Sequence, residues 1–358
     1  MPTSFLRNGL TSLALCGVIF LIQPSLGTEA PARAAAAKQR DTNSADARLR
    51  ALYTEEWNWR RKEMARSSDQ PGEAGESNHF PRVDAASQQA RLAYWTRVLA
   101  TLNSIPLADL SPEERVNAQV FAASIRAFTH DIKYRIYEAP FNSDTFFWTE
   151  FTPRQGFATA NAYRAYLGRL RDVPRYFDEQ ITNMRAGIAR GFTVPLVAVL
   201  GREKTIEPYI NGDRGNPLYA PFAQMPSHIS ATEQDTIRRE ADTVLREAVA
   251  PAYERLLTFM RTEYMPKART NIAAAAMPEG DAYYQAMIEK FTTLTLTPQQ
   301  IHDIGLAEVA RIDSEMVATM RRAGFKGTKA QFMHFLRTDP RFYARTPREL
   351  LATSAYVA

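Results

Sequence analysis

Helix-start signals recur along the chain where a polar stretch gives way to a periodic apolar one. At six such junctions a Ser or Thr is followed three residues later by Glu or Gln, a pair that caps a first helical turn. The six hydroxyl residues are Ser111, Thr152, Ser230, Thr297, Thr328 and Thr346. Strand-like alternation is scarce and is confined to residues 192–200. We therefore expect a mainly α protein with a multi-helix, bundle-like body and at most a minor β element.

The helix predicted over 298–323 has the widest apolar sector. At 100° per residue its apolar side chains cover more than half of the circumference, which is more than a surface helix needs. They are Ile301, Ile304, Leu306, Val309, Ile312, Met316, Val317 and Met320. We expect this helix to be buried on two sides and to end at Gly324, which favours a left-handed C-terminal residue.

Residues 202–230 are rich in Asn, Gly and Pro and predict a loop of nearly thirty residues. Loops of that length in compact domains are usually functional or disordered, and the aromatic side chains of Tyr209, Tyr219 and Phe222 favour an ordered one. It is either a binding loop or a surface excursion packed by its own side chains. A second, shorter loop is expected at 78–83.

The N-terminus has the pattern of a secretory signal peptide. Arg7 precedes an apolar run at 10–22 that is too short to span a bilayer, and small residues follow it. We expect a signal peptide over 1–27, a flexible linker over 28–46 and a helical domain over 47–358. Cleavage implies a periplasmic or secreted product without a stable membrane span; an uncleaved anchor is the alternative.

Composition narrows the class of protein. The 358 residues are 45% hydrophobic and 23% charged, which is typical of a folded globular chain. A net charge of +5 without clustering does not indicate a nucleic-acid surface, so we expect no nucleic-acid partner. The single cysteine, Cys16, lies within the predicted signal peptide, so the mature chain would have neither disulfides nor thiolate ligands.

Searching for chemistry yields no catalytic residue and no metal ligand. No two of the five histidines lie one helical turn apart, as a helical zinc hydrolase site requires. Phosphate-binding glycine motifs and the serine-hydrolase elbow are also missing from the sequence. Four residues remain as candidates for lining a substrate cleft: Tyr219, Tyr283, Tyr284 and His302. Each has a structural alternative, since the tyrosines could pack a core and His302 could be a hydrogen-bonded core group.

A resemblance adds to this interpretation. Gly280-Asp-Ala-Tyr-Tyr, the run from Phe291 to Ile312, and Phe342-Tyr343 are similar to the exported bacterial family called domain of unknown function 885. Upstream, Arg154-Gln-Gly-Phe and Pro217-Leu-Tyr-Ala-Pro-Phe fit the family in the same order. The resemblance implies a helical fold akin to zinc carboxypeptidases, with a His-Glu-x-x-Pro-Gly-His motif as the metal site of full-length relatives.

That motif would lie beyond residue 358, and the helix predicted from Thr346 has no capping residue or polar tail at its end. We therefore expect an incomplete domain, cut within an element; a docked terminal helix is the alternative. Zinc is then implied for full-length relatives, and no cofactor is expected in this chain. Two hypotheses follow: the N-terminal part of a zinc-dependent hydrolase of peptides, or a non-catalytic binding or scaffold protein of the cell envelope.

Overall fold

The computed structural model describes residues 29–64, 77–149, 151, 153 and 156–358, so the predicted signal peptide at 1–27 lies outside the described residues. The described chain is mainly helical, as predicted, and its β pairing is limited to an isolated bridge between Phe141 and Phe146. No strand forms at 192–200. Residues 192–195 have no regular secondary structure, the N–H of Val194 donates to the Tyr264 hydroxyl, and the next residues form the short helix α5 (Leu196–Val199).

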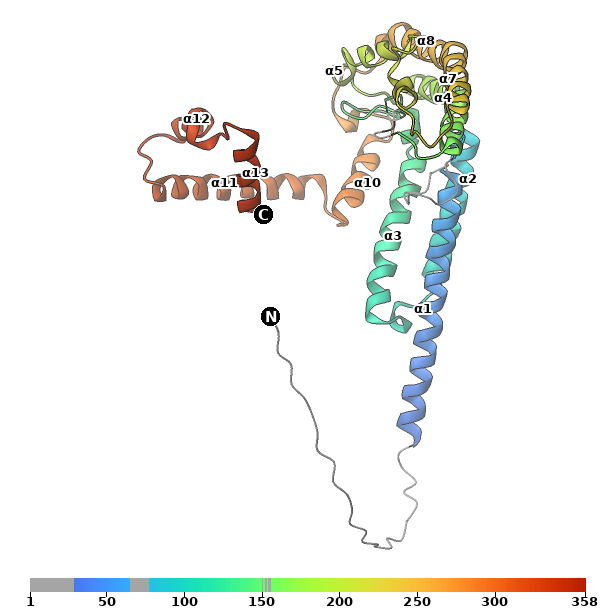
Figure 1. The fold of residues 1–358 in the computed structure, drawn as a ribbon. Helices are drawn as coiled ribbons and strands as arrows, with labels where there is room; N and C mark the ends of the chain where they lie inside the picture. Colours follow the sequence, from blue (N-terminus) through green and yellow to red (C-terminus); the bar gives the residue numbers. More distant parts are fainter. Residues whose placement is uncertain (1–28, 65–76, 150, 152, 154–155) are drawn as a thin grey trace, which may run out of the picture.

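Three helices make an elongated stalk, drawn in blue and cyan in Figure 1. They are α1 (Glu29–Glu63), α2 (Ala85–Asn103) and α3 (Pro112–Lys133), with η1 (Leu107–Asp109) between the last two. A buried Trp95 on α2 donates its indole N–H to Glu56 of α1 at 3.0 Å. Helix α1 covers most of 28–46, where the sequence predicts a flexible linker. The run of four alanines at 34–37 accounts for the difference, because Ala is the strongest helix former.

The body of the protein is built around α4 (Ala160–Arg190), which packs along a helical rod formed by 231–267. The rod consists of α7 (Ala231–Val244), η6 (Leu245–Val249), α8 (Ala250–Phe259), η7 (Met260–Tyr264) and α9 (Met265–Lys267). Phe177 of α4 and Tyr253 of α8 are both fully buried in this core, with their rings 4.8 Å apart. The tyrosine hydroxyl donates to the carbonyl of Trp148 at 2.6 Å, so its burial leaves no polar group unpaired.

Two π turns interrupt the rod. In η6 the N–H of Ala250 bonds to the carbonyl of Leu245, and in η7 that of Met265 bonds to Met260, five residues back in each case. A proline lies two residues after the end of each turn, at 251 and 266. Because proline has no N–H and crowds the preceding turn, a locally widened helix is an expected response.

Residues 202–230 form an ordered loop, as predicted. It contains η3 (Arg202–Thr205), η4 (Glu207–Tyr209), η5 (Pro217–Tyr219) and α6 (Ala220–Ala223). Tyr163 and Tyr166 of α4 donate their hydroxyls to loop carbonyls at 3.1 Å each. The loop is therefore fixed by side chains that satisfy backbone groups which irregular structure leaves unpaired.

The loop at 78–83 is held on α4 in the same way. Asp172 accepts the N–H of Phe80 at 2.7 Å, and Glu179 accepts that of Val83 at 2.8 Å. Arg175 lies between these two carboxylates and donates to both. Carboxylates of one helix thus accept backbone N–H groups that would be paired with a neighbouring strand in a sheet.

The last part of the described chain extends away from the body (Figure 1). After α10 (Gly280–Thr292) come α11 (Pro298–Arg322), α12 (Lys329–Thr338) and α13 (Pro347–Val357). Gly324 ends α11 with a positive φ of 70°, as predicted. The prediction that this helix is buried on two sides is wrong: Leu306 is 59% exposed and Val309 67%. Within the described chain α11 packs on α12, and Met320 near the end of α11 is buried. The part of the apolar sector that contains Ile304, Leu306, Val309 and Ile312 is exposed.

The remaining short elements are η2 (Ile136–Glu138), η8 (Ala274–Ala276) and η9 (Pro340–Phe342). Among the residues described, none of the helices has the length and apolar character needed to cross a membrane.

Candidate functional site

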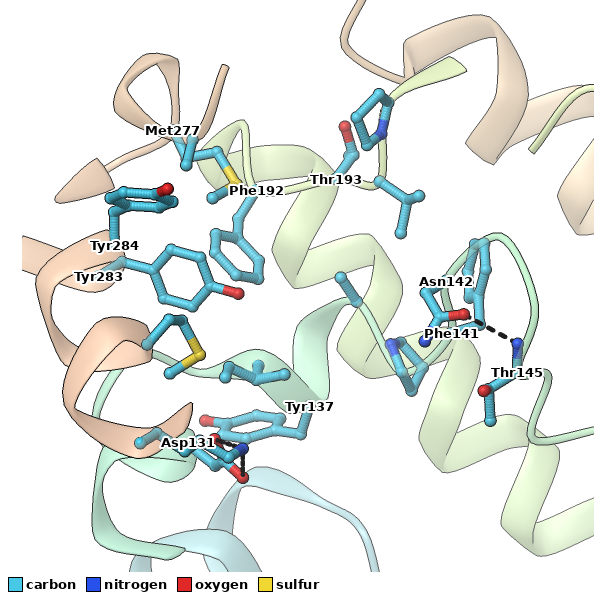
Figure 2. Close-up of a pocket in the computed structure, with 18 of the residues that line it drawn as sticks. Asp131, Tyr137, Phe141, Asn142, Thr145, Phe192, Thr193, Met277, Tyr283 and Tyr284 are labelled. Atoms are coloured by element: carbon cyan, nitrogen blue, oxygen red, sulfur yellow. Dashed lines mark hydrogen bonds and ion pairs between the residues drawn. The ribbon is translucent and has the colours of Figure 1, made fainter. Parts of the chain in front are cut away.

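A cavity of about 950 Å³ lies where the stalk meets the body (Figure 2). One wall is α10. The others are the end of α3 with η2, the turn at 139–145, residues 192–195, and the segment 269–277, which contributes Arg269, Ala274 and Met277; Gln88 of α2 adds a further contact. Segments far apart in sequence thus converge on one space, which is typical of ligand sites.

Gly187 of α4 sets the distance between two of these walls. A Cβ at this position would lie 2.7 Å from the carbonyl oxygens of both Glu138 and Phe192. Glu138 belongs to η2, and Phe192 lines the cavity. Only glycine lets both backbones approach α4 this closely.

Asn142 shapes the opposite wall. Its side-chain oxygen accepts the N–H groups of Asp144 and Thr145, both at 2.8 Å, which closes the turn. The oxygen is therefore occupied, and the amide –NH₂ is the end left for a ligand. Figure 2 shows Asn142 across the cavity from Tyr283.

Helix α10 contributes Tyr283 and Tyr284. The ring of Tyr283 makes edge contacts with Phe192 at 6.0 Å and with Tyr134 at 5.9 Å, and its hydroxyl points into the cavity (Figure 2). Burial raises the pKa of Tyr283, and the nearby Asp131 carboxylate raises it further. The phenol is therefore a neutral hydrogen-bond donor at physiological pH. Tyr284 lies at the rim and is 46% exposed.

An ion pair and a set of hydrogen bonds hold the walls in place. Lys290 of α10 bridges both oxygens of Asp131 on α3, at 2.7 and 2.8 Å. Arg269 donates its Nε to the carbonyl of Thr193 at 2.8 Å, and its backbone N–H to the Thr193 hydroxyl at 2.9 Å. Burial lowers the pKa of Arg269, and the nearby Tyr264 and Tyr283 partly oppose that shift.

The structure brings two of the four predicted cleft residues together. Tyr283 and Tyr284 line the cavity, whereas Tyr219 and His302 do not. Tyr219 is 5% exposed within the core, its hydroxyl has no hydrogen-bond partner in the described chain, and burial raises its pKa. His302 lies on α11, within the segment 298–357 that extends away from the body (Figure 1) and is called the arm.

Sequence reasoning missed Asp131, Asn142 and Arg269. The run Asn142-Ser-Asp is a turn signal, so the sequence could have indicated that Asn142 lies in a turn. The ion pair of Asp131 spans 159 positions, and no local pattern reports a contact of that range.

The residues described do not fit a zinc ion. They contain no group of three or more His, Cys, Asp or Glu side chains that could hold a metal. The zinc implied by the family resemblance thus has no ligand set in this part of the chain, and the cavity is considered for binding alone.

Comparison with known proteins agrees with the resemblance. The model of the family described as "Bacterial protein of unknown function (DUF885)" matches residues 29–357. The chain belongs to this family. For this DUF885 protein, no curated protein shows significant similarity.

The fold is also similar to a solved structure, "The crystal structure of the putative lipoprotein from Colwellia psychrerythraea", with a TM-score of 0.69 at 19% identity. The match covers 89% of the DUF885 chain and 57% of the solved chain, so this chain spans a little over half the length of that structure. At this identity the match supports the helical fold alone.

Proposed function

We propose that this DUF885 protein is the ligand-binding part of an exported peptide hydrolase, and that the cavity beside α10 holds a peptide. The observation that carries the proposal is the cavity itself, of about 950 Å³ with mainly apolar and aromatic walls and a few convergent polar groups. Sites for small ligands range over roughly 300–1,000 Å³ and combine these same features.

The walls offer complementary chemistry for a peptide. Phe141, Phe192 and Met277 supply apolar surface for side chains. The –NH₂ of Asn142 and the hydroxyl of Tyr283 supply donors from two sides. Peptide carbonyls are acceptors, so two donors separated across an apolar space suit a backbone better than a purely apolar ligand.

The hydrolytic step is implied only by the family resemblance, and none of the residues that line the cavity is assigned to it. Zinc, when bound in a full-length relative, would activate a water molecule for attack on a carbonyl. The residues of this chain would bind and orient the ligand. The rival hypothesis of a non-catalytic envelope protein predicts the same binding without cleavage.

Equilibrium dialysis of the full chain against a degenerate peptide mixture, with retained peptides identified by mass spectrometry, tests the proposal. We expect retention by the wild type, loss of most of it in Tyr283→Ala, and none of that loss in Tyr343→Ala, an exposed tyrosine on the arm. Unchanged retention in Tyr283→Ala would refute the proposed site.

Incubation of the retained peptides with a zinc-loaded full-length relative that carries the His-Glu-x-x-Pro-Gly-His motif separates the two hypotheses. Cleavage of these peptides supports the hydrolase, and their survival supports the binding protein. Export has its own readout: N-terminal sequencing of envelope material should begin between Thr28 and Ala35, and a cytoplasmic product that keeps Met1 would contradict it.

A further inference from the structure

The charged side chains that line the cavity carry a net positive charge. Three charged side chains lie in its walls: Asp131, Arg269 and Lys290. Asp131 and Lys290 neutralise each other through their two short contacts. One positive charge, that of Arg269, is left over.

Arg269 is bound by backbone carbonyls alone. Its Nε donates to Thr193, and its Nη1 donates to the carbonyls of Asn271 and Ala273. Nowhere in the described chain does a carboxylate form an ion pair with it, and its Nη2 has no recorded hydrogen bond there. An arginine stays protonated in proteins, so the carbonyls orient the charge without neutralising it.

Several other arginines with little solvent exposure in this protein are paired with acids. Arg91 bonds to Glu63 at 2.9 Å, and Arg190 bonds to Glu138 at 2.6 Å. Arg175 bonds to two acids, Asp172 and Glu179. Partly buried cations are normally paired in this way, because removing them from water is unfavourable. Arg269 therefore lacks the kind of partner that comparable arginines have here.

We propose that Arg269 binds a carboxylate of the ligand, with the hydroxyl of Tyr283 as a second donor. The two groups are close enough for the charge of Arg269 to influence the ionisation of the phenol. A single carboxylate balances the single excess charge, whereas a phosphate dianion would leave the cavity negative. Charge-assisted bonds of this kind are about twice as strong as neutral ones.

This inference rests on the proposed function, because it assumes that the cavity is a ligand site. It adds the class of ligand: one with a free carboxylate, supplied either by a peptide C-terminus or by an acidic side chain.

Titration calorimetry of the full chain with N-acetyl-phenylalanine and with its amide tests the charge directly. The two ligands differ only in the carboxylate. We expect the acid to bind at least about tenfold more tightly than the amide, because a hydrogen bond to a charged group is stronger than one to a neutral group. Equal binding, or no binding of either ligand, would overturn the inference, and so would tighter binding of inorganic phosphate.

Variants assign the effect to Arg269. Arg269→Met should abolish the preference for the acid, Arg269→Lys should keep part of it, and Arg348→Met, an exposed control on the arm, should leave it unchanged. If Arg269→Met does not fold, Arg269→Lys together with the acid-to-amide ratio of the wild type still decides. A preference that survives in Arg269→Met refutes the assignment.

Two tripeptides identify the source of the carboxylate, one with a free C-terminus and one with a C-terminal amide and an internal Asp. Preference for the first assigns a chain end, and preference for the second an acidic side chain. The proposed function can fail separately. If the acid binds more tightly than the amide but no peptide is retained in the dialysis, the carboxylate site is supported and the proposal of peptide binding is refuted.

Discussion

Replacing Gly187 by Ala should destabilise the protein, although alanine favours helices. The added Cβ would lie 2.7 Å from two backbone oxygens, where ordinary contact begins at 3.4 Å. Those oxygens belong to Glu138 and Phe192, so no side chain can rotate away and whole segments must shift. Overpacking costs about 1–3 kcal/mol, and we take the upper end, about 3 kcal/mol, because two backbone segments must move; the gain in helix propensity is roughly 1 kcal/mol. We expect a net loss of about 2 kcal/mol.

The matched control is Gly305→Ala. Gly305 also lies inside a helix, but a Cβ there meets nothing within 4 Å. It should therefore raise the stability of α11 or leave the melting transition unchanged. Thermal and urea unfolding followed by circular dichroism measure both variants. Because Phe192 and η2 line the cavity, Gly187→Ala should also weaken binding of N-acetyl-phenylalanine. A Gly187→Ala protein as stable as Gly305→Ala would refute the close approach of these walls.

Two further results are expected. Burial alone would raise the pKa of Asp172, but hydrogen bonds from Arg175 and from the N–H of Phe80 outweigh it and hold that pKa below its usual value. This stabilisation is complete above the unfolded pKa of about 3.9 and is lost as pH falls through the lower folded pKa. The melting temperatures of wild type and Asp172→Asn should therefore differ by a constant amount well above that pH and converge as pH falls below it; a difference that persists at low pH would contradict this. The exposed apolar side chains of α11 and α13, including Leu351 at 71%, should bind a hydrophobic dye or cause self-association, and Leu351→Lys should reduce both effects; a monodisperse wild type without dye binding would exclude such a surface.

The sequence predicted what depends on local signals. The helices at Ser111, Ser230, Thr297, Thr328 and Thr346 begin where the capping residues place them, and each hydroxyl accepts the expected N–H. The sixth capping residue, Thr152, lies outside the described residues, and the next helix along the chain, α4, begins after Thr159. The ordered loop at 202–230 was predictable because its aromatic residues were visible as core anchors. These features need only neighbours a few positions away.

Long-range contacts could not be predicted in this way. The apolar sector of α11 correctly indicates a surface that favours burial, but periodicity does not say which element covers it. Of the residues that line the cavity, the sequence analysis named Tyr283 and Tyr284. Arg269 resembles any surface arginine in the sequence, and only the fold reveals that carbonyls surround it.

Because of its two π turns, the rod depends on the number of its residues as much as on their identity. Each contains one residue more than a regular turn and so rotates everything downstream by about 100°. Deleting a single residue within η6 would restore regular geometry there and turn the fully buried Tyr253 and Tyr264 away from the core. Two compensating changes, a deletion in one π turn and an insertion in the other, would misplace only the segment between them. Alignments of related chains should therefore avoid gaps across 245–264, even where individual residues differ.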